Sequence, residues 1–272
     1  MNAMFTIVKE QFQSFYLIRR LSMFEVKSDN SNNYLGMLWE IIKPMILIGI
    51  YWFVFGFGIR HGRGDVNGIE YLPWLLAGIV VWFFFHSALD NGSKAIYKRV
   101  KMISKMNFPM SAIPTYVILS KFYSHLGLLA IILIILQFFG FTVSIYLLQL
   151  PYYIFATMAL LVSVCLLTST LTTVVRDIQM FISSVMRMLL YLSPILWTPE
   201  TNDQLPEFVG TIMKLNPLYY IVEGYRSSLL GTEWYFAEHA QYTLYFWLVV
   251  LLFLVFGSML HMKFRTRFVE FI

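Results

Sequence analysis

Charged residues and cysteine are scarce in this chain. Lys, Arg, Asp and Glu make up 13% of its 272 residues, whereas a soluble globular protein carries about 25%. Apolar residues make up 58% of the chain, and this balance indicates an integral membrane protein. Because Cys165 is the one cysteine, an intramolecular disulfide is excluded.

Several motifs that mark enzymes are also missing. The sequence has no G-x-x-x-x-G-K-[ST] loop to hold nucleotide phosphates. It has neither an H-E-x-x-H motif nor clustered Cys and His to hold a metal, and no G-x-S-x-G elbow for a serine nucleophile. We therefore expect no enzyme, no metal and no cofactor in this chain, and an energy source in another protein.

Long apolar runs occupy most of the sequence. Five of them lie at about residues 45–59, 71–89, 113–138, 151–175 and 241–262, and a sixth, at about 178–198, carries one Arg. A helix needs about 20 mostly apolar residues to cross a hydrocarbon core of about 30 Å. The first run reaches that length only if it begins near Leu35. The sequence therefore predicts an all-α polytopic membrane protein with six transmembrane helices.

Lys and Arg gather in residues 9–27, 94–105 and 263–267, which fall on one side of a six-span arrangement. Because positive loops remain cytoplasmic, both termini are predicted to be cytoplasmic. The formal net charge of +5 then reflects topology rather than binding to nucleic acid.

Residues 1–33 are predicted to form an amphipathic helix along the cytoplasmic interface, followed by a transmembrane domain over residues 34–272. This helix either serves only to lie at the membrane surface, or it also contacts a partner protein. The apolar positions of its stripe recur at helical spacing: Met4, Val8, Phe12, Phe15 and Ile18.

Two connections are longer than simple loops. Residues 92–110 are basic and include a predicted short helix at 95–105, either as a solvated positive loop or as a contact for a cytoplasmic partner. In residues 199–240, Asn216 can cap a helix that Pro217 starts and Gly231 ends. This helix is too short to span a membrane and is typical of a re-entrant or interfacial segment.

Several short motifs occur in a fixed order along the chain: Tyr34 to Pro44, Phe108-Pro109, Arg176-Asp177-Ile178, Ser193-Pro194-Ile195, Leu205-Pro206, Leu215-Asn216-Pro217-Leu218 and Arg226. This order resembles that of the type-2 ABC exporter permeases that move polysaccharides, over nearly the whole chain. Within that family, residues 51–60, 72–84 and 107–116 are similar to the teichoic acid translocation permeases.

The resemblance implies a half-transporter in the cytoplasmic membrane of a bacterium. Two copies of the chain would pair, and two copies of a separate P-loop ATPase, which uses ATP and Mg²⁺, would dock beneath them. A lipid-diphosphate-linked wall teichoic acid polymer would pass outward. The resemblance places the ATPase contacts in the N-terminal helix, the 95–105 helix and the turn after the fourth span, at Phe12, Arg19, Arg20, Tyr97, Arg99, Lys101, Arg176 and Asp177.

Arg187 lies in the middle of the fifth span, where an ionisable side chain costs about 2.5 kcal/mol or more. It could meet the diphosphate of the substrate, or it could pair internally or reach the headgroups. The other candidates for the pathway are aromatic residues, which could equally serve in the core or in interfacial belts: Tyr51, Phe55, Tyr191 and Trp197.

Asp90 and Lys121 are predicted to form a structural ion pair between the second and third spans. A proton relay through His86 and His125 is the competing explanation, although ATP-driven export does not need one.

Three alternatives remain for the function. A permease for O-antigen or capsule is closely related. A membrane-embedded glycosyltransferase or polymerase would show acidic residues for a metal or base and would act without an ATPase. A membrane anchor that transports nothing would require neither Arg187 nor a re-entrant segment.

Overall fold

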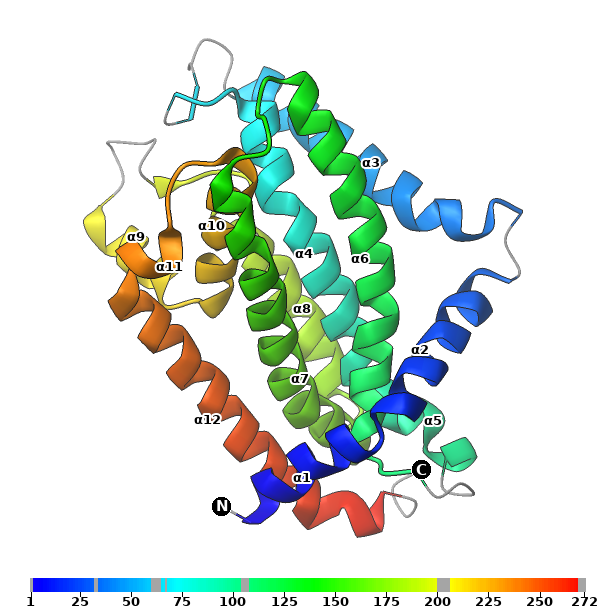
Figure 1. Ribbon diagram of the computed structural model, residues 1–272. Helices are drawn as coiled ribbons and strands as arrows, with labels where there is room; N and C mark the ends of the chain where they lie inside the picture. Colours follow the sequence, from blue (N-terminus) through cyan, green and yellow to red (C-terminus); the bar gives the residue numbers. More distant parts are fainter. Residues whose placement is uncertain are drawn as a thin grey trace.

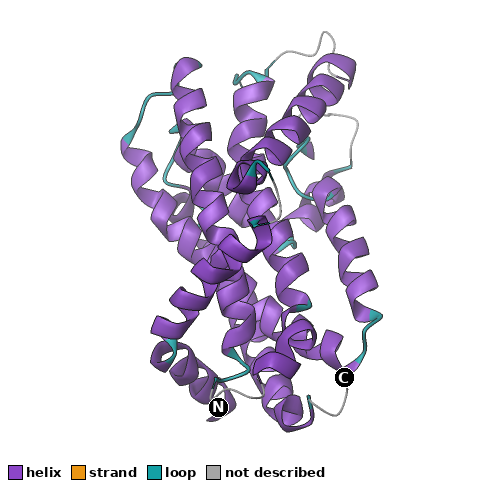
Figure 2. Cartoon of the chain, turned by 90° about the vertical axis from the view of Figure 1, so that its right-hand side faces the viewer, coloured by secondary structure: helices purple, strands orange, loops and turns teal. Residues whose placement is uncertain are grey.

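The computed structural model describes residues 2–31, 34–59, 65–66, 68–103, 108–199 and 206–268, and these ranges are almost entirely helical. Figure 1 shows a bundle of long helices with both termini at one end, and Figure 2 shows the same bundle from its side. The all-α expectation is confirmed. Lys105 and Leu205, which belong to the predicted connecting segments, lie outside the described residues.

Within the described ranges, five helical segments are long and apolar enough to cross a membrane. A sixth apolar helix, α8, covers only Ile178–Tyr191, so the predicted count of six depends on this shorter element. The helix ends three residues before Pro194, and a proline disfavours the helical conformation of the residue that precedes it. The five are α3 (Trp39–Tyr51) with the π-helical η2 (Trp52–Ile59), α4 (Tyr71–Ser93), α6 (Ala112–Phe138), α7 (Leu150–Val174) and α12 (Ala240–Phe264).

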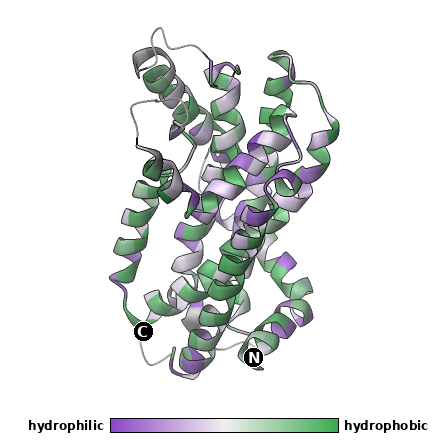
Figure 3. Cartoon of the chain, turned by 90° about the vertical axis from the view of Figure 1, so that its left-hand side faces the viewer, coloured by the Kyte–Doolittle hydropathy of each residue, from purple (hydrophilic) through white to green (hydrophobic). Residues whose placement is uncertain are grey.

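Helix α4 is the centre of the bundle and packs against α6, α7 and α10. In the most apolar 18-residue stretch of α4, 78% of the residues are buried, whereas only 6% are buried in the corresponding stretch of the first span. A helix that is apolar on all sides is buried, as α4 is. Figure 3 shows apolar residues along most of the length of the long helices.

The segment before the last span contains the predicted short helix, α10 (Pro217–Leu230), between α9 (Glu207–Lys214) and α11 (Tyr235–Glu238). The Asn216 side chain accepts a hydrogen bond from the amide of Leu218 at 3.0 Å. Gly231 ends the helix with a φ of +72°, which glycine adopts at little cost. Every residue of α10 except Pro217 and Glu223 is buried, so α10 is an internal helix packed against α4 and α7.

The N-terminal segment forms two helices, α1 (Asn2–Gln13) and α2 (Phe15–Asn30), rather than one. Its predicted stripe divides between two surroundings, because Ile18 is 2% exposed whereas Phe12 and Phe15 are 78% and 61% exposed. Ile18 packs in a small core with Ile96 of α5, with Phe108 of the connection before α6, and with the first residues of α6, which are Ala112, Ile113, Tyr116 and Val117. The remaining short elements are α5 (Ala95–Ile103), η1 (Gly36–Leu38), η3 (Ile145–Gln149) and η5 (Arg265–Arg267).

A prediction follows from the close approach of α10 to α7. A Cβ atom at Gly224 would lie 2.0 Å from a ring carbon of Tyr153. Because overpacking typically costs about 1–3 kcal/mol, Gly224→Ala should lower the thermal stability of the detergent-solubilised protein. Thermal denaturation followed by size-exclusion chromatography measures the effect.

The matched control is Gly49→Ala in α3, where an added Cβ would meet nothing within 4 Å. This change should leave stability unchanged or raise it by about 1 kcal/mol, since alanine favours helix over glycine. Equal melting temperatures for the Gly224→Ala variant and the parent would contradict the tight α7–α10 packing.

Candidate translocation pathway and coupling surface

The exposed face of α8 carries the cation that the sequence singled out. Arg187 is exposed, and its guanidinium donates a hydrogen bond to Ser184 Oγ at 3.1 Å. Within the part of the chain that the structure describes, it forms no salt bridge with a carboxylate, so the internal pair, which was one of the alternatives for Arg187, is not seen there. Around it, Phe181 and Met188 are 68% and 53% exposed. A cation on such a face is stable against water, a polar ligand or another chain rather than lipid.

The four aromatic candidates lie on α3, η2, α8 and the connection after α8. The rings of Tyr51 and Phe55 meet edge to face with centroids 6.5 Å apart. The indole of Trp197 donates a hydrogen bond to the carbonyl of Tyr191 at 2.9 Å. Since Tyr191 lies one turn after Arg187, the residues Arg187, Tyr191 and Trp197 lie near one another at the end of α8, whereas Tyr51 and Phe55 form a separate aromatic pair in the first span.

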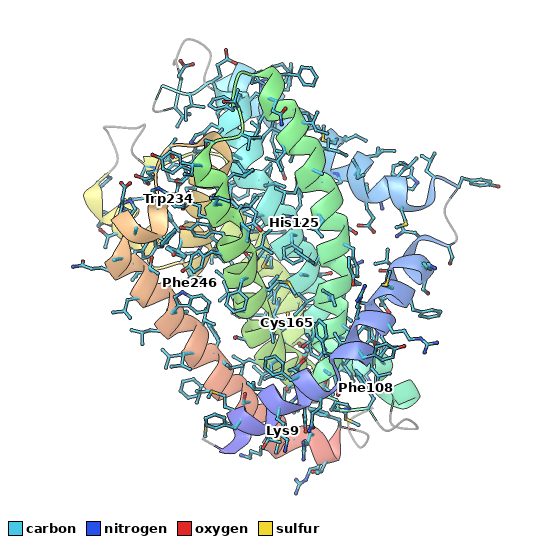
Figure 4. The ribbon with its side chains drawn as sticks, viewed as in Figure 1. Lys9, Phe108, His125, Cys165, Trp234 and Phe246 are labelled. Carbon is cyan, nitrogen blue, oxygen red and sulfur yellow. The ribbon has the colours of Figure 1, made fainter. Side chains whose placement is uncertain are left out.

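The predicted contacts for an ATPase lie at the end of the bundle that holds both termini. Figure 4 shows Lys9 of α1 and Phe108, which follows α5, at this end. Arg19 and Arg20 of α2 are exposed there. The remaining exposed members of the predicted set are Phe12, Arg176 and Asp177, while Tyr97 is half-buried.

Positive charge is concentrated on α5. Burial and the neighbouring charges of Lys94 and Arg99 lower the pKa of Lys98. Arg99 itself is held within the chain, because it pairs with Glu25 of α2 and lies over the Tyr116 ring at 5.8 Å. Arg99 therefore joins α5 to α2 and α6 rather than standing free for a partner. The side chain of Lys101 lies outside the described part of α5.

The prediction of an ion pair between Asp90 and Lys121 is wrong, because each side chain pairs with a different residue. Lys121 Nζ lies 2.7 Å from Asp29 Oδ2 of α2. Asp90 pairs instead with Lys94, one turn further along, at 2.6 Å, a spacing that places two side chains of a helix side by side. Asp90 also accepts a hydrogen bond from the Gln179 amide at 3.0 Å, which ties the start of α8 to the end of α4.

A hollow of about 390 Å³ lies between the α2–α3 region and the facing sides of α4 and α6. Its lining includes both charges of the Asp29–Lys121 pair, together with Glu40, Lys43 and His86. His125 also borders it but is buried, and its Nε2 lies 3.1 Å from the Tyr225 hydroxyl. His125 thus joins α6 to α10.

In the sequence Arg226 stood out only as a motif residue, whereas in the structure its buried guanidinium contacts three segments of the chain. It is 5% exposed. Its guanidinium donates to the carbonyl of Pro194 at 2.6 Å, pairs with Glu223, and lies 3.8 Å from the centroid of the Trp74 ring. The spacing of Glu223 and Arg226, three residues apart on a short apolar helix, is a sequence signal for their ion pair, but not for the contacts of Arg226 with Pro194 and Trp74.

The bundle of long apolar helices, with its buried internal helix α10, is that of a polytopic membrane protein. A family model described as ABC-2 type transporter matches residues 16–230, which is more than half of the chain. The chain therefore belongs to the ABC-2 type transporter family, and it is a multi-span membrane protein that serves as a transport subunit rather than a catalytic one.

The chain matches three named relatives over most of their length. The chain is 27% identical over 248 residues to the O-antigen export system permease protein RfbA of Klebsiella pneumoniae, covering 90% of this chain and 91% of that protein. It is 21% identical to the RfbA protein of Myxococcus xanthus, covering 82% and 84%. The inner membrane transport permease YadH of Escherichia coli K12 is 22% identical, covering 70% and 75%. The polysaccharide permease class expected from the motifs is supported, whereas these relatives do not indicate teichoic acid.

A prediction follows from the burial of Arg226. Arg226→Met should lower the free energy of unfolding by about 3–5 kcal/mol, because it leaves Glu223 charged and without this partner in a largely buried place. Removing both charges in Glu223→Gln/Arg226→Met should restore part of the loss. Thermal denaturation of the purified variants measures this difference.

Arg20→Met removes a cation from the exposed surface of α2 and serves as the control, with an expected change within about 0.5 kcal/mol. If Arg226→Met and Arg20→Met melted at the same temperature, the structural role of Arg226 would be refuted.

Proposed function

We propose that this chain is the permease subunit of an ATP-driven exporter for a lipid-diphosphate-linked polysaccharide in the cytoplasmic membrane of a bacterium. The observation that carries the proposal is the exposed Arg187 of α8, with Tyr191 one turn after it, in a chain of the ABC-2 family.

In this proposal the chain works as a homodimer. Elements η2 and α8 present apolar side chains that the single chain leaves uncovered, with Phe53 of η2 66% exposed and Met180 of α8 76% exposed. Pairing of two copies would enclose these faces around a shared pathway. Arg187 would then meet the diphosphate, and the aromatic rings would offer flat apolar surface to sugar rings without demanding one pattern of hydroxyls.

Energy would come from two copies of a separate P-loop ATPase that holds ATP and Mg²⁺. The basic end of the bundle offers its docking surface, with exposed cations on α2 and at Arg176. Both termini would lie at this cytoplasmic end, in keeping with the distribution of Lys and Arg.

Two polymers compete within the proposed class. The names of the K. pneumoniae and M. xanthus relatives favour an O-antigen type of polysaccharide. The motif wording at residues 51–60 and 107–116 favours wall teichoic acid. Complementation of strains that lack one or the other permease, each supplied with the partner ATPase, distinguishes them.

Arg187→Ala should reduce export at least about tenfold, equivalent to ~1.4 kcal/mol, while the variant accumulates and assembles as the parent does. Arg187→Lys keeps the charge and should retain part of the activity. Export of the lipid-linked polymer, measured beside gel filtration of the purified complex, gives both readings. Failure of Arg187→Ala to accumulate would instead assign Arg187 a structural role.

Co-purification from the native membrane should recover a P-loop ATPase in roughly equal amount, with measurable ATP hydrolysis. The double charge reversal Arg19→Glu/Arg20→Glu should weaken that recovery severalfold, because it reverses two exposed charges at the docking end. Asp65→Lys is the control, because it reverses an exposed charge in the connection between η2 and α4, which is not part of the proposed docking surface. It should leave recovery of the ATPase unchanged. Recovery of the chain alone, or with sugar-transferring activity and no ATPase, would refute the exporter.

A further inference from the structure

A cavity of about 650 Å³ lies among α9, α10, α11 and the start of α12. Figure 1 shows these elements together on one flank, well away from the termini. The volume falls within the range of small-molecule sites, about 300–1,000 Å³. None of the five pathway candidates is among the described residues that line it, so the cavity is distinct from the face of α8.

Tyrosine rings form much of the cavity wall. Tyr242 and Tyr245 are stacked with centroids 5.9 Å apart and planes 16° from parallel. Their hydroxyls donate hydrogen bonds of 2.7 Å to the carbonyls of Lys214 and Leu215. Because both hydroxyls are bound to the end of α9, the rings are fixed in orientation. Tyr219 meets Tyr242 edge to face at 6.3 Å and extends the aromatic wall.

Trp74 also lines the cavity, but its ring is already engaged. The Arg226 guanidinium lies 3.8 Å from its centroid, and the Tyr71 ring stacks against it at 5.9 Å. Trp74 therefore supports the floor of the cavity, and the tyrosines of α12 supply the surface that a ligand would contact.

The charges that line the cavity are largely balanced. Glu223 pairs with Arg226, and Glu233 lies 3.5 Å from His239. Lys214 is a further cation of the lining. A carboxylate offers about four acceptor positions, so a paired carboxylate can still accept hydrogen bonds from hydroxyl groups. Balanced charge with aromatic faces favours a neutral polyhydroxylated ligand over a phosphate.

We propose that this cavity binds a neutral sugar residue, with the rings of Tyr242 and Tyr245 against its apolar face and Glu223 and Glu233 accepting from its hydroxyls. The assignment rests on the proposed function, because the sugar would come from the exported polysaccharide. It deepens that function by adding a saccharide site outside the pathway of the lipid diphosphate.

The test is a pair of tryptophan variants one turn apart on α12. Gln241 lines the cavity, so Gln241→Trp should fill it. Leu244 is 63% exposed and is not part of the lining, so Leu244→Trp is the matched control. Saturation-transfer NMR on the purified protein in detergent would measure binding of the methyl glycosides of glucose, galactose, mannose and N-acetylglucosamine.

We expect at least one methyl glycoside to bind the parent and the Leu244→Trp variant equally. Gln241→Trp should raise its dissociation constant at least about tenfold, or ~1.4 kcal/mol. Inorganic phosphate should not displace the glycoside. Absence of binding by all the glycosides, equal binding by both variants, or displacement by phosphate would overturn the assignment.

Export by the parent protein, measured in parallel, keeps this proposal separate from the proposed function. Export without glycoside binding would refute the saccharide site and leave the exporter standing. Glycoside binding that Gln241→Trp abolishes, in a protein that neither exports nor recovers an ATPase, would refute the exporter and leave a carbohydrate-binding membrane protein.

Discussion

The buried guanidinium of Arg226 is the interaction on which the rest of the structure depends. It contacts α4 through Trp74, the connection after α8 through Pro194, and its own helix through Glu223. The contacts come from different parts of the sequence. Loss of any one of them would leave the buried charge less well compensated and would lower the free energy of unfolding. Gly78 provides the room, because a Cβ there would lie 2.5 Å from the guanidinium. Helix α10 is therefore fixed at one place between α4 and α7.

This placement fixes the C-terminal end of α8 as well. The Asn216 side chain, which caps α10, also donates a hydrogen bond to Ser193 Oγ at 2.9 Å. The connection after α8 is thus held by the start of α10 as well as by Arg226. At the other end Gln179 ties α8 to Asp90. Held at both ends, α8 presents Arg187 in a defined direction although much of its surface is uncovered.

Features that depend on local chemistry could be predicted from the sequence. Apolar runs marked the spans, and Asn216, Pro217 and Gly231 marked α10, because a capped helix is specified by its own residues. The proximity of Arg187 and Tyr191 on α8 also followed from helical spacing.

Features that depend on packing between distant segments could not be predicted. The partner of Lys121 is set by how α2 lies against α6. The division of the N-terminal stripe reflects the core around Ile18, which includes Phe268 from the far end of the chain. The burial of Arg226 likewise required three segments to meet, and no spacing along the sequence encodes that meeting.

The sparse packing of the first span has a mechanical consequence. Because α4 is held in the core and the first span is not, α3 and η2 can change their tilt relative to α4 while few core contacts are broken. The main resistance to this movement then comes from the surrounding lipid and from any chain that covers the first span. Segments with few buried contacts supply the moving parts of proteins. Helix α2 contacts η1, at the start of this span, and also packs against α6, so a displacement of α2 would act on the first span and on α6 at the same time.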